Sequence, residues 1–253
     1  MQNIEQTSMS IDNLIFRASA VPNLMGAKGL GITGQKEVIK AYLNQFTDRY
    51  KEVKSKYLEK GIAMEGGAIQ LVNELRGTDY LKNDVRMFND FLTGECDLVS
   101  GDTISDIKCS WDIFTFYESM GSDGKDYEYQ LRAYMELWNR PKSEVIYCLM
   151  DMPDNMLLNE LERAGRPYDG DLPDLIAIRI IKNSIFDLDN FHRFLEFAPI
   201  DRKAVEKEIN KFVHIPKADR VYSFDFERNQ TKTDLMYQRI YDARQFLKTH
   251  LKK

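Results

Sequence analysis

The feature that most constrains this chain is a pair of opposite charges inside an apolar stretch, residues 94–111. The stretch predicts two short strands joined by a Ser-Gly-Asp turn at residues 100–102. Asp106 and Lys108 are two residues apart, so in a strand they share one face, while Ile107 between them points to the other. Charges in such a strand are costly unless they pair with each other or bind a metal ion. The hairpin is therefore the first place to expect a functional site.

Composition indicates an ordinary globular protein that is long enough to bury a substantial core. Of 253 residues, 43% are hydrophobic and 30% are charged, and no apolar run reaches membrane-spanning length. The first residues lack the basic-then-apolar pattern of a signal peptide, so we expect a cytoplasmic location. The net charge of −5 argues against a generally basic nucleic-acid coat protein. It leaves room for a local basic groove, because a catalytic site rich in acids lowers the pI by itself.

The cysteines and histidines offer no metal-binding pattern. Three scattered cysteines have no zinc spacing and cannot supply four thiolates to an iron–sulfur cluster, so we interpret them as small buried apolar side chains. The three histidines lie far apart in the sequence and are expected to be structural or exposed. These residues are Cys96, Cys109, Cys148, His192, His214 and His250.

Hydrophobic periodicity predicts alternating helices and strands in one domain, residues 1–253. Its core spans about residues 55–150, preceded by an N-terminal segment (1–54) and followed by a mainly helical elaboration (151–253). The near-continuous apolar run at 143–150 is typical of a strand buried on both faces. Helices are predicted from residue 33 and over 56–75, 127–139 and 231–251, and strands over 85–92, within 94–111, and over 143–150 and 221–226.

The helix over residues 56–75 carries a carboxylate in line with its apolar residues. Glu65 continues the stripe formed by Leu58, Ile62, Ile69 and Val72, which favours an inward functional acid over a surface residue. Two glycines follow at positions 66 and 67; they destabilise a helix and so suggest that a strand or a substrate approaches closely. Four lysines near this helix fit either a solvated face or a phosphate-contacting rim: Lys51, Lys54, Lys56 and Lys60.

Three acids are turned inward by these patterns: Glu65, Asp97 and Asp106. Converging carboxylates raise each other's pKa unless a cation lies among them. Mg²⁺ and Mn²⁺ prefer such oxygen ligands, and the carbonyl of Ile107 could add one more. A metal ion held there would activate water and neutralise a phosphodiester, while Lys108 would orient that water. The pattern thus points to phosphodiester hydrolysis, with salt-bridged hairpin acids as the alternative.

These residues resemble a known signature. Asp97 followed by Asp106-Ile107-Lys108 is similar to the PD-(D/E)XK motif of restriction-endonuclease-like nucleases. Glu65 on the preceding helix and Gln130-x-x-x-Tyr134 on the following one resemble the further motifs of the RecB, YqaJ and lambda-exonuclease branch. The resemblance spans roughly residues 55–150, and the order of elements fits the αβββαβ core of that fold.

The resemblance implies an α/β fold with a central mixed sheet flanked by helices, and a metal-dependent deoxyribonuclease. The first expectation is an exonuclease that acts on linear double-stranded DNA ends in phage-type recombination or DNA processing. It further implies roles for individual residues: Glu65, Asp97, Asp106 and Ile107 bind one or two Mg²⁺ or Mn²⁺ ions, Lys108 positions water, Gln130 and Tyr134 orient the substrate, and Arg17 and Ser19 hold DNA phosphate.

The sequence departs from the family pattern at two positions, and other functions are compatible with it. Cys96 occupies a position that is often Pro, and Asp106 replaces the commoner Glu. The Cas4 branch is disfavoured because the chain lacks its iron–sulfur cysteines. An endonuclease for defence or repair, or a non-catalytic DNA-binding or assembly module, are the rival functions. Polarity, a ring-shaped homo-oligomer and a partner single-strand annealing protein are left open by the sequence.

Overall fold

A four-stranded mixed sheet forms the centre of the computed structural model, which describes residues 10–51 and 55–251. Its strands lie in the order β4-β5-β6-β7. Strand β5 pairs in parallel with β6, and the other two pairings are antiparallel. The strands are β4 (Leu98–Ser100), β5 (Thr103–Cys109), β6 (Lys142–Cys148) and β7 (Val221–Glu227). The predicted mixed α/β architecture, with strands in these places, is confirmed.

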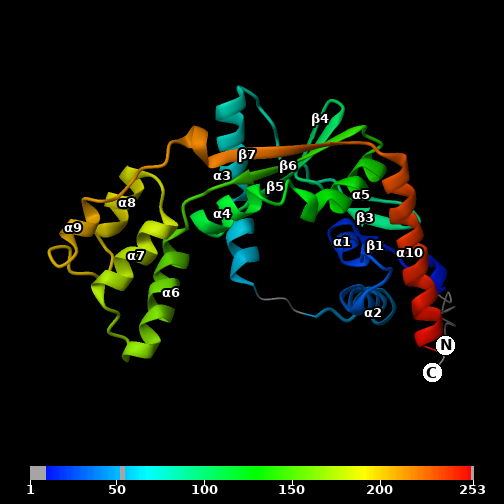
Figure 1. Ribbon diagram of the computed structural model, residues 1–253, viewed down its shortest axis with the longest axis horizontal. Helices are drawn as coiled ribbons and strands as arrows, with labels where there is room; N and C mark the ends of the chain where they lie inside the picture. The colour runs from blue at the N-terminus through cyan, green and yellow to red at the C-terminus, as the bar shows by residue number, and fades with distance from the viewer. Residues whose placement is uncertain (1–9, 52–54, 252–253) are drawn as a thin grey trace, which may run out of the picture.

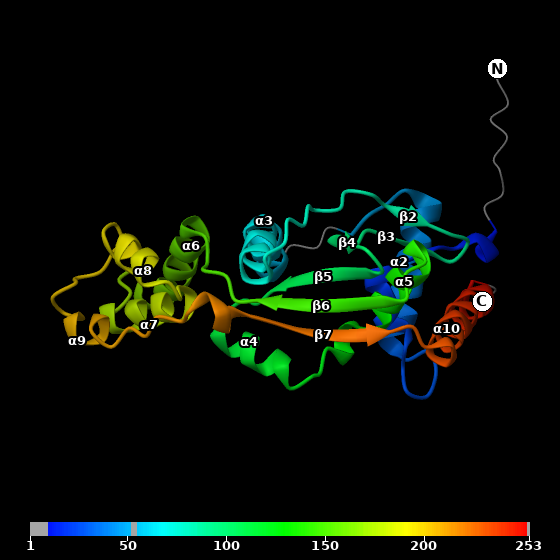
Figure 2. The same ribbon diagram turned by 90° about the horizontal axis from the view of Figure 1, so that it is seen from above.

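Both faces of this sheet are covered. On β6, Val145 and Tyr147 pack into the main core, whereas Ile146 and Cys148 pack against helix α3 (Lys56–Arg76) with Ala68 and Val72. Figure 2 shows α3 next to β5, with which it is in contact, and α4 (Ile113–Met120) next to β7. The expectation of a strand buried on both faces is therefore confirmed.

Helix α3 has the predicted length, but its predicted apolar stripe is wrong in the first half. Leu58 and Ile62 are 52% and 67% exposed, whereas Ile69 and Val72 are buried. The reason is that the sheet covers only the second half of the helix, around residues 68–72. Gly67 has Met150 beside it, while Gly66 has open space where a side chain would lie. The predicted close approach holds for one glycine of the pair.

The strand predicted over residues 85–92 is also wrong as a single element. It divides into β2 (Met87–Phe88) and β3 (Leu92–Gly94), which form a hairpin in a separate sheet ordered β1-β3-β2. Asn89 makes the turn, because its side-chain oxygen accepts hydrogen bonds from the backbone N–H groups of Phe91 and Leu92. The first strand, β1 (Phe16–Arg17), pairs in parallel with β3.

Helices gather at the two ends of the central sheet (Figure 1). At one end α5 (Glu128–Trp138) contacts α1 (Val21–Leu24), and α10 (Gln230–His250) contacts α2 (Ile32–Thr47). The other end holds α6 (Asp154–Gly165), α7 (Asp174–Ser184), α8 (Leu188–Leu195) and α9 (Glu206–Ile209). Helices α6–α9 enclose a hydrophobic cluster of their own.

Two further sequence expectations can be compared with the described residues. Cys96 and Cys148 are buried and Cys109 is half-buried, all as free thiols, in line with their predicted role as small apolar side chains. None of the described helices has the length and apolarity needed to cross a membrane. Lys54, one of the four lysines of the predicted cationic run, lies outside the described residues.

Candidate active site

The predicted site residues line one cavity of about 620 Å³ beside strand β5. Strand β5 and the residue before β4 supply the central charges, α3 and α5 supply side chains on either side, and the segment around β1 closes one wall. The predicted residues in the lining are Arg17, Ser19, Glu65, Asp97, Asp106, Ile107, Lys108, Gln130 and Tyr134. The structure thus brings together every residue that the sequence nominated.

Asp106 is held at the centre of the cavity by helix α5. Only 3% of the residue is exposed, and its Oδ1 accepts a hydrogen bond of 2.9 Å from Gln130 Nε2. The same amide nitrogen donates to the Tyr134 hydroxyl at 3.2 Å. Gln130 and Tyr134 are four residues apart on one helix, so they share a face and reach Asp106 together. Burial raises the pKa of the Tyr134 hydroxyl, which therefore stays protonated.

Lys108 neutralises the other oxygen of Asp106. Its Nζ lies 2.6 Å from Asp106 Oδ2 and 4.6 Å from the centre of the Tyr127 ring. Burial lowers the pKa of Lys108, but the close contact with Asp106 and the nearby Tyr127 and Asp97 together outweigh it, so the net shift of the pKa is upward. Asp106 Oδ2 accepts no hydrogen bond of regular geometry from the described residues. The Lys108 ammonium is thus the partner of Asp106 Oδ2 among the described residues, and both groups face the same cavity.

Asp97 lies directly before β4 and contacts the backbone of β5. Its Oδ2 accepts a hydrogen bond of 2.5 Å from the Ile107 N–H. Burial raises the pKa of Asp97 to about 7, and the nearby charge of Asp106 adds to the effect. In an extended strand the N–H and C=O of one residue leave on the same side. The Ile107 carbonyl is therefore directed toward the edge where Asp97 lies.

Glu65 lines the same cavity from helix α3, but it is engaged elsewhere. Its Oε2 lies 3.0 Å from Lys82 Nζ, and its side chain is 22% exposed. Among the described residues, no group of three or more His, Cys, Asp or Glu side chains lies close enough together to hold a metal ion. The cavity instead offers two carboxylates and a carbonyl, with Glu65 at the rim. Hard oxygen donors of this kind fit Mg²⁺ or Mn²⁺, and Asp106 Oδ2 accepts no hydrogen bond of regular geometry from the described residues.

The N-terminal wall of the cavity is placed by unusually close packing. Arg17 and Ser19 flank Ala18, which is buried against Gly94 of strand β3. A Cβ on Gly94 would lie 2.7 Å from the Tyr134 ring and 3.0 Å from the Ala18 side chain. Only glycine lets the segment, the strand and the helix meet this closely. The exposed side chains of Arg17 and Ser19 consequently border the acids.

Sequence reasoning missed the role of Lys60, which is fully buried rather than part of a solvated or phosphate-contacting run. Its Nζ donates hydrogen bonds to the backbone carbonyls of Ser110 at 2.9 Å and Trp111 at 2.8 Å. Burial lowers its pKa to about 8. The signal was present in the spacing, because positions 60, 68 and 72 lie on one face of a helix. Lys60 ties helix α3 to the end of β5.

Sequence patterns also missed Tyr127, which lines the cavity, and Lys82, which contacts Glu65 at its rim. Tyr127 was not nominated, although it lies three residues before Gln130 and therefore on the same side of the chain as it enters α5. Lys82 gave no sequence signal, because its contact with Glu65 depends on how the loop after α3 folds back. These residues supply the aromatic floor under Lys108 and the ion pair at the rim.

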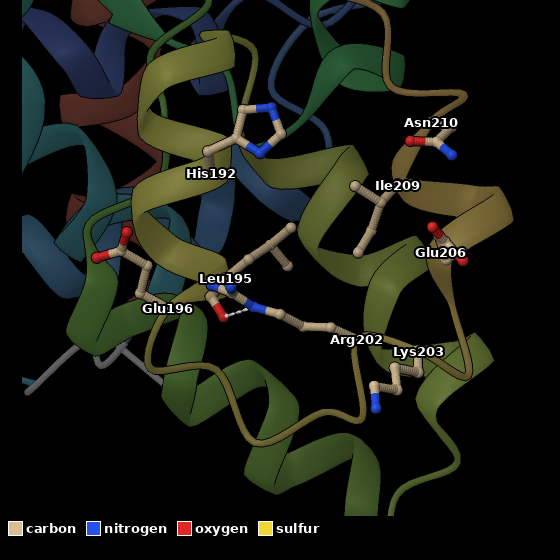
Figure 3. Close-up of a pocket in the computed structure, with 8 residues that line it drawn as sticks. All are labelled: His192, Leu195, Glu196, Arg202, Lys203, Glu206, Ile209 and Asn210. Atoms are coloured by element: carbon tan, nitrogen blue, oxygen red, sulfur yellow. Dashed lines mark hydrogen bonds between the residues drawn. The ribbon is translucent and has the colours of Figure 1, made fainter.

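A second cavity, of about 720 Å³, lies between helices α8 and α9 (Figure 3). Arg202 closes one side of it by donating a hydrogen bond from Nε to the Leu195 carbonyl at 2.7 Å. Its other lining residues are His192, Glu196, Lys203, Glu206, Ile209 and Asn210. None of the site residues predicted from the sequence lines this second cavity. They all line the cavity around Asp106.

Solved structures of exonucleases have a similar fold. A phage-related exonuclease from Haemophilus somnus 129PT is 22% identical, with a TM-score of 0.68 over 95% of this chain and 96% of that one. The alkaline exonuclease LHK-Exo from Laribacter hongkongensis is 12% identical, with a TM-score of 0.58 over 95% and 91%, and is also known in complex with dAMP. The chain has the restriction-endonuclease-like fold of these exonucleases.

The resemblance stated from the motif residues is thereby confirmed for the fold. At 12–22% identity, these structures show that the fold is shared, and the chemistry is inferred from the residues of the cavity. No family model and no curated protein matches the sequence. The likeness extends over nearly the whole chain, including the helical parts outside residues 55–150.

Proposed function

We propose that the chain is a metal-dependent deoxyribonuclease that hydrolyses phosphodiester bonds in the cavity around Asp106. The observation that carries the proposal is the buried Asp106–Lys108 pair, which Gln130 clamps and Asp97 adjoins. Burying an acid and a lysine in this way is costly, and a purely structural pair could be replaced by apolar residues without loss. The exonuclease neighbours, one of them solved with the nucleoside monophosphate dAMP, support a nucleic-acid substrate.

Each residue has a role that follows from its contacts. Asp97, Asp106 and the Ile107 carbonyl would hold one or two Mg²⁺ or Mn²⁺ ions, with Glu65 contributing directly or through water. Such an ion supplies charge neutralisation and a more acidic bound water. Lys108, fixed beside Asp106, would orient the attacking water and stabilise the negative charge that develops on the oxygens of the phosphate.

The substrate is held by the walls of the cavity. Gln130 donates one N–H of its amide to Asp106 and the other to the Tyr134 hydroxyl, so this pair would orient the substrate by holding Asp106 in place. Arg17 and Ser19 border the acids from the opposite wall, where a guanidinium and a hydroxyl can hold a DNA phosphate. Because such contacts bind the sugar-phosphate backbone, we propose cleavage without sequence recognition.

We further propose that the enzyme is an exonuclease that acts on the ends of linear duplex DNA, as in phage-type recombination or DNA processing. End-labelled linear duplex and closed circular duplex are incubated with the protein and Mg²⁺ or Mn²⁺. The proposal predicts release of nucleotides from the linear DNA while the circle stays intact, and the labelled end gives the polarity. Cleavage of the circle would favour the endonuclease. No cleavage of either DNA would contradict the nuclease itself.

A non-catalytic module on the same fold is the candidate from another class. Thermal unfolding with and without Mn²⁺ separates the two, because ligands that bind the native state raise its stability. A rise in the midpoint that is absent in Asp106→Ala supports the enzyme. An unchanged midpoint supports the module. The ring-shaped homo-oligomer and the annealing partner remain predictions.

A further inference from the structure

Two connected cavities lead from the candidate active site along helix α2. A cavity of about 400 Å³ between α2 and the β1-β3-β2 sheet shares Arg17 with the acidic cavity. A cavity of about 730 Å³ on the outer side of α2 shares Lys40 and Tyr50 with the one before it. We name this surface the α2 track and define it by Arg17, Lys36, Lys40, Tyr50, Arg86 and Phe88.

The small sheet fixes one end of the track. In its register Arg17 lies beside Thr93, and Thr93 lies beside Phe88 across the next strand. Phe16 and Leu92, their neighbours in the chain, are fully buried and point to the opposite face. Arg17 and Phe88 therefore project from the same outer face on either side of Thr93, and their spacing is set by strand pairing.

The charge of the track is opposite to that of the acidic cavity. The two cavities along α2 are lined by six cationic side chains and a single carboxylate, Glu37. The acidic cavity carries four carboxylates against two cations, Arg17 and Lys108. Arg86 joins the two regions, because its Nη2 lies 3.0 Å from Glu95 of the acidic cavity. A polyanion that is repelled by the acids would be attracted by the adjoining track.

Two large aromatic rings are exposed among these cations. Tyr50 is 72% exposed and Phe88 is 77% exposed, although both are side chains that usually gain from burial. Cationic side chains interleaved with exposed rings are typical of surfaces that bind single-stranded nucleic acid, where bases stack on rings and phosphates contact the cations. A duplex keeps its base faces stacked inside and would leave the rings unused.

We propose that the α2 track binds a single-stranded stretch of DNA that is continuous with the strand in the acidic cavity. Arg17, Lys36, Lys40 and Arg86 contact its phosphates, and Phe88 and Tyr50 stack on its bases. The inference rests on the proposed function and deepens it: the DNA is unpaired next to the site of cleavage. The track then holds the strand in place while successive phosphates enter the acidic cavity.

The test measures binding apart from cleavage. In a Lys108→Ala background, the affinity for a fluorescein-labelled oligothymidine is measured by anisotropy at several salt concentrations. Phe88→Leu, which keeps an apolar side chain without a ring, lowers the affinity about tenfold, and Phe88→Trp retains it. Lys36→Ala lowers the slope of log affinity against log salt by about 0.7, the value for one single-strand phosphate contact.

Matched controls come from the helices at the other end of the molecule. Phe197→Leu removes an exposed ring and Lys207→Ala removes an exposed cation, and both leave affinity and salt slope unchanged. Unchanged affinity in Phe88→Leu together with an unchanged slope in Lys36→Ala overturns the track. Cleavage is measured separately with Lys108 intact, so absence of cleavage speaks against the proposed function, and loss of binding in Phe88→Leu still supports the track.

Discussion

At the scale of single residues, the site depends on how Asp106 is held. Its two oxygens have different partners: Oδ1 accepts from Gln130 at 2.9 Å, and Oδ2 faces Lys108 at 2.6 Å. These two contacts hold the Asp106 carboxylate in one orientation inside the cavity. The orientation of Asp106 is thus a property of helix α5 as much as of strand β5.

Replacing Gln130 with Leu should weaken catalysis while leaving the fold intact. The leucine fills similar space but donates no hydrogen bond to Asp106, so the ligand loses its orientation. Loss of such a supporting contact typically costs about 10- to 100-fold in metal affinity or activity. Mn²⁺ titration of activity checks this, and Gln238→Leu, on the exposed side of α10, is the control. Wild-type activity in Gln130→Leu would remove Gln130 from the site.

Lys60 should make stability depend on pH with a defined sign. Its pKa is about 8 in the native state, below the ordinary value of 10.5. Below pH 8 both states carry the proton, and the full cost of burying the charge is present. Between these values only the unfolded chain binds the proton, so the native state gains stability as pH rises.

The change Lys60→Met isolates this effect, because methionine does not titrate. The free energy of unfolding of the wild type, relative to that of Lys60→Met, should therefore rise by up to about 3 kcal/mol between pH 8 and 10.5. Urea unfolding across this range measures it, with the exposed Lys207→Met as control. If the wild-type and Lys60→Met curves stay parallel, Lys60 is charged in the native state throughout.

Much of the candidate site could be predicted from residue spacing, because spacing alone decides which side chains share a face. The Asp-x-Lys alternation placed Asp106 and Lys108 together, and the four-residue step placed Gln130 beside Tyr134. Contacts that depend on a loop folding back, such as Lys82 on Glu65, follow no local period and could not be predicted. The predicted metal-binding and catalytic roles remain to be tested.

At the scale of secondary-structure elements, glycine sets the distance between β3 and α5. Gly94→Ala should destabilise the protein by about 1–3 kcal/mol, because the added methyl would overlap the Tyr134 ring and Ala18. Gly66→Ala is the control, since open space surrounds that position and alanine favours a helix. Chemical unfolding compares the two. Equal stability of Gly94→Ala and the wild type would show that β3 can move away without cost.

Two elements that sequence patterns mispredicted have separate local causes. The hydrophobic run at 85–92 suggested one strand, but the Asn89 side chain caps a turn there and divides it into β2 and β3. The stripe on α3 failed where the helix extends past the sheet that buries its second half. The start of α2 and both ends of α10 were predicted to within one residue. Hydrophobic periodicity does not indicate where a side chain caps a turn, or how much of a helix the sheet covers.

At the scale of the whole molecule, two hydrophobic clusters are joined by adjacent residues. Ile185 is buried in the cluster of helices α6–α9, and Phe186 is buried in the main core. Asp151 fixes this joint, since its Oδ1 accepts a hydrogen bond from the Phe186 N–H at 2.9 Å. We therefore expect the chain to unfold as one unit, in keeping with the predicted single domain.

The two tryptophans allow a test of this cooperativity. Trp111 packs against the cluster of α6–α9 and Trp138 against the main core, so single-tryptophan variants report on each. Phe191→Ala, which removes a buried ring stacked on Phe212, should cost about 3–5 kcal/mol. Both fluorescence signals should shift to the same lower urea midpoint. A shift confined to the Trp111 signal would show two independently unfolding units.

Acidic and basic side chains gather in different regions of the molecule. The chain has a net charge of −5, yet the α2 track gathers cations beside a cavity rich in acids. The composition was compatible with a local basic groove but could not predict it, because a count of charges does not show where they lie. The fold separates them: the acids face inward from β5 and α3, and the cations lie along α2.

The most direct test of the nuclease site is metal-dependent release of nucleotides from end-labelled linear DNA by variants of the buried pair. Asp106→Ala and Lys108→Ala should each lower the rate by about 100-fold or more, because the pair acts where charge develops. Glu74→Ala and Lys217→Ala, which break an exposed pair of 2.6 Å, should keep the wild-type rate. Metal-dependent cleavage that survives both Asp106→Ala and Lys108→Ala would contradict a catalytic centre at Asp106.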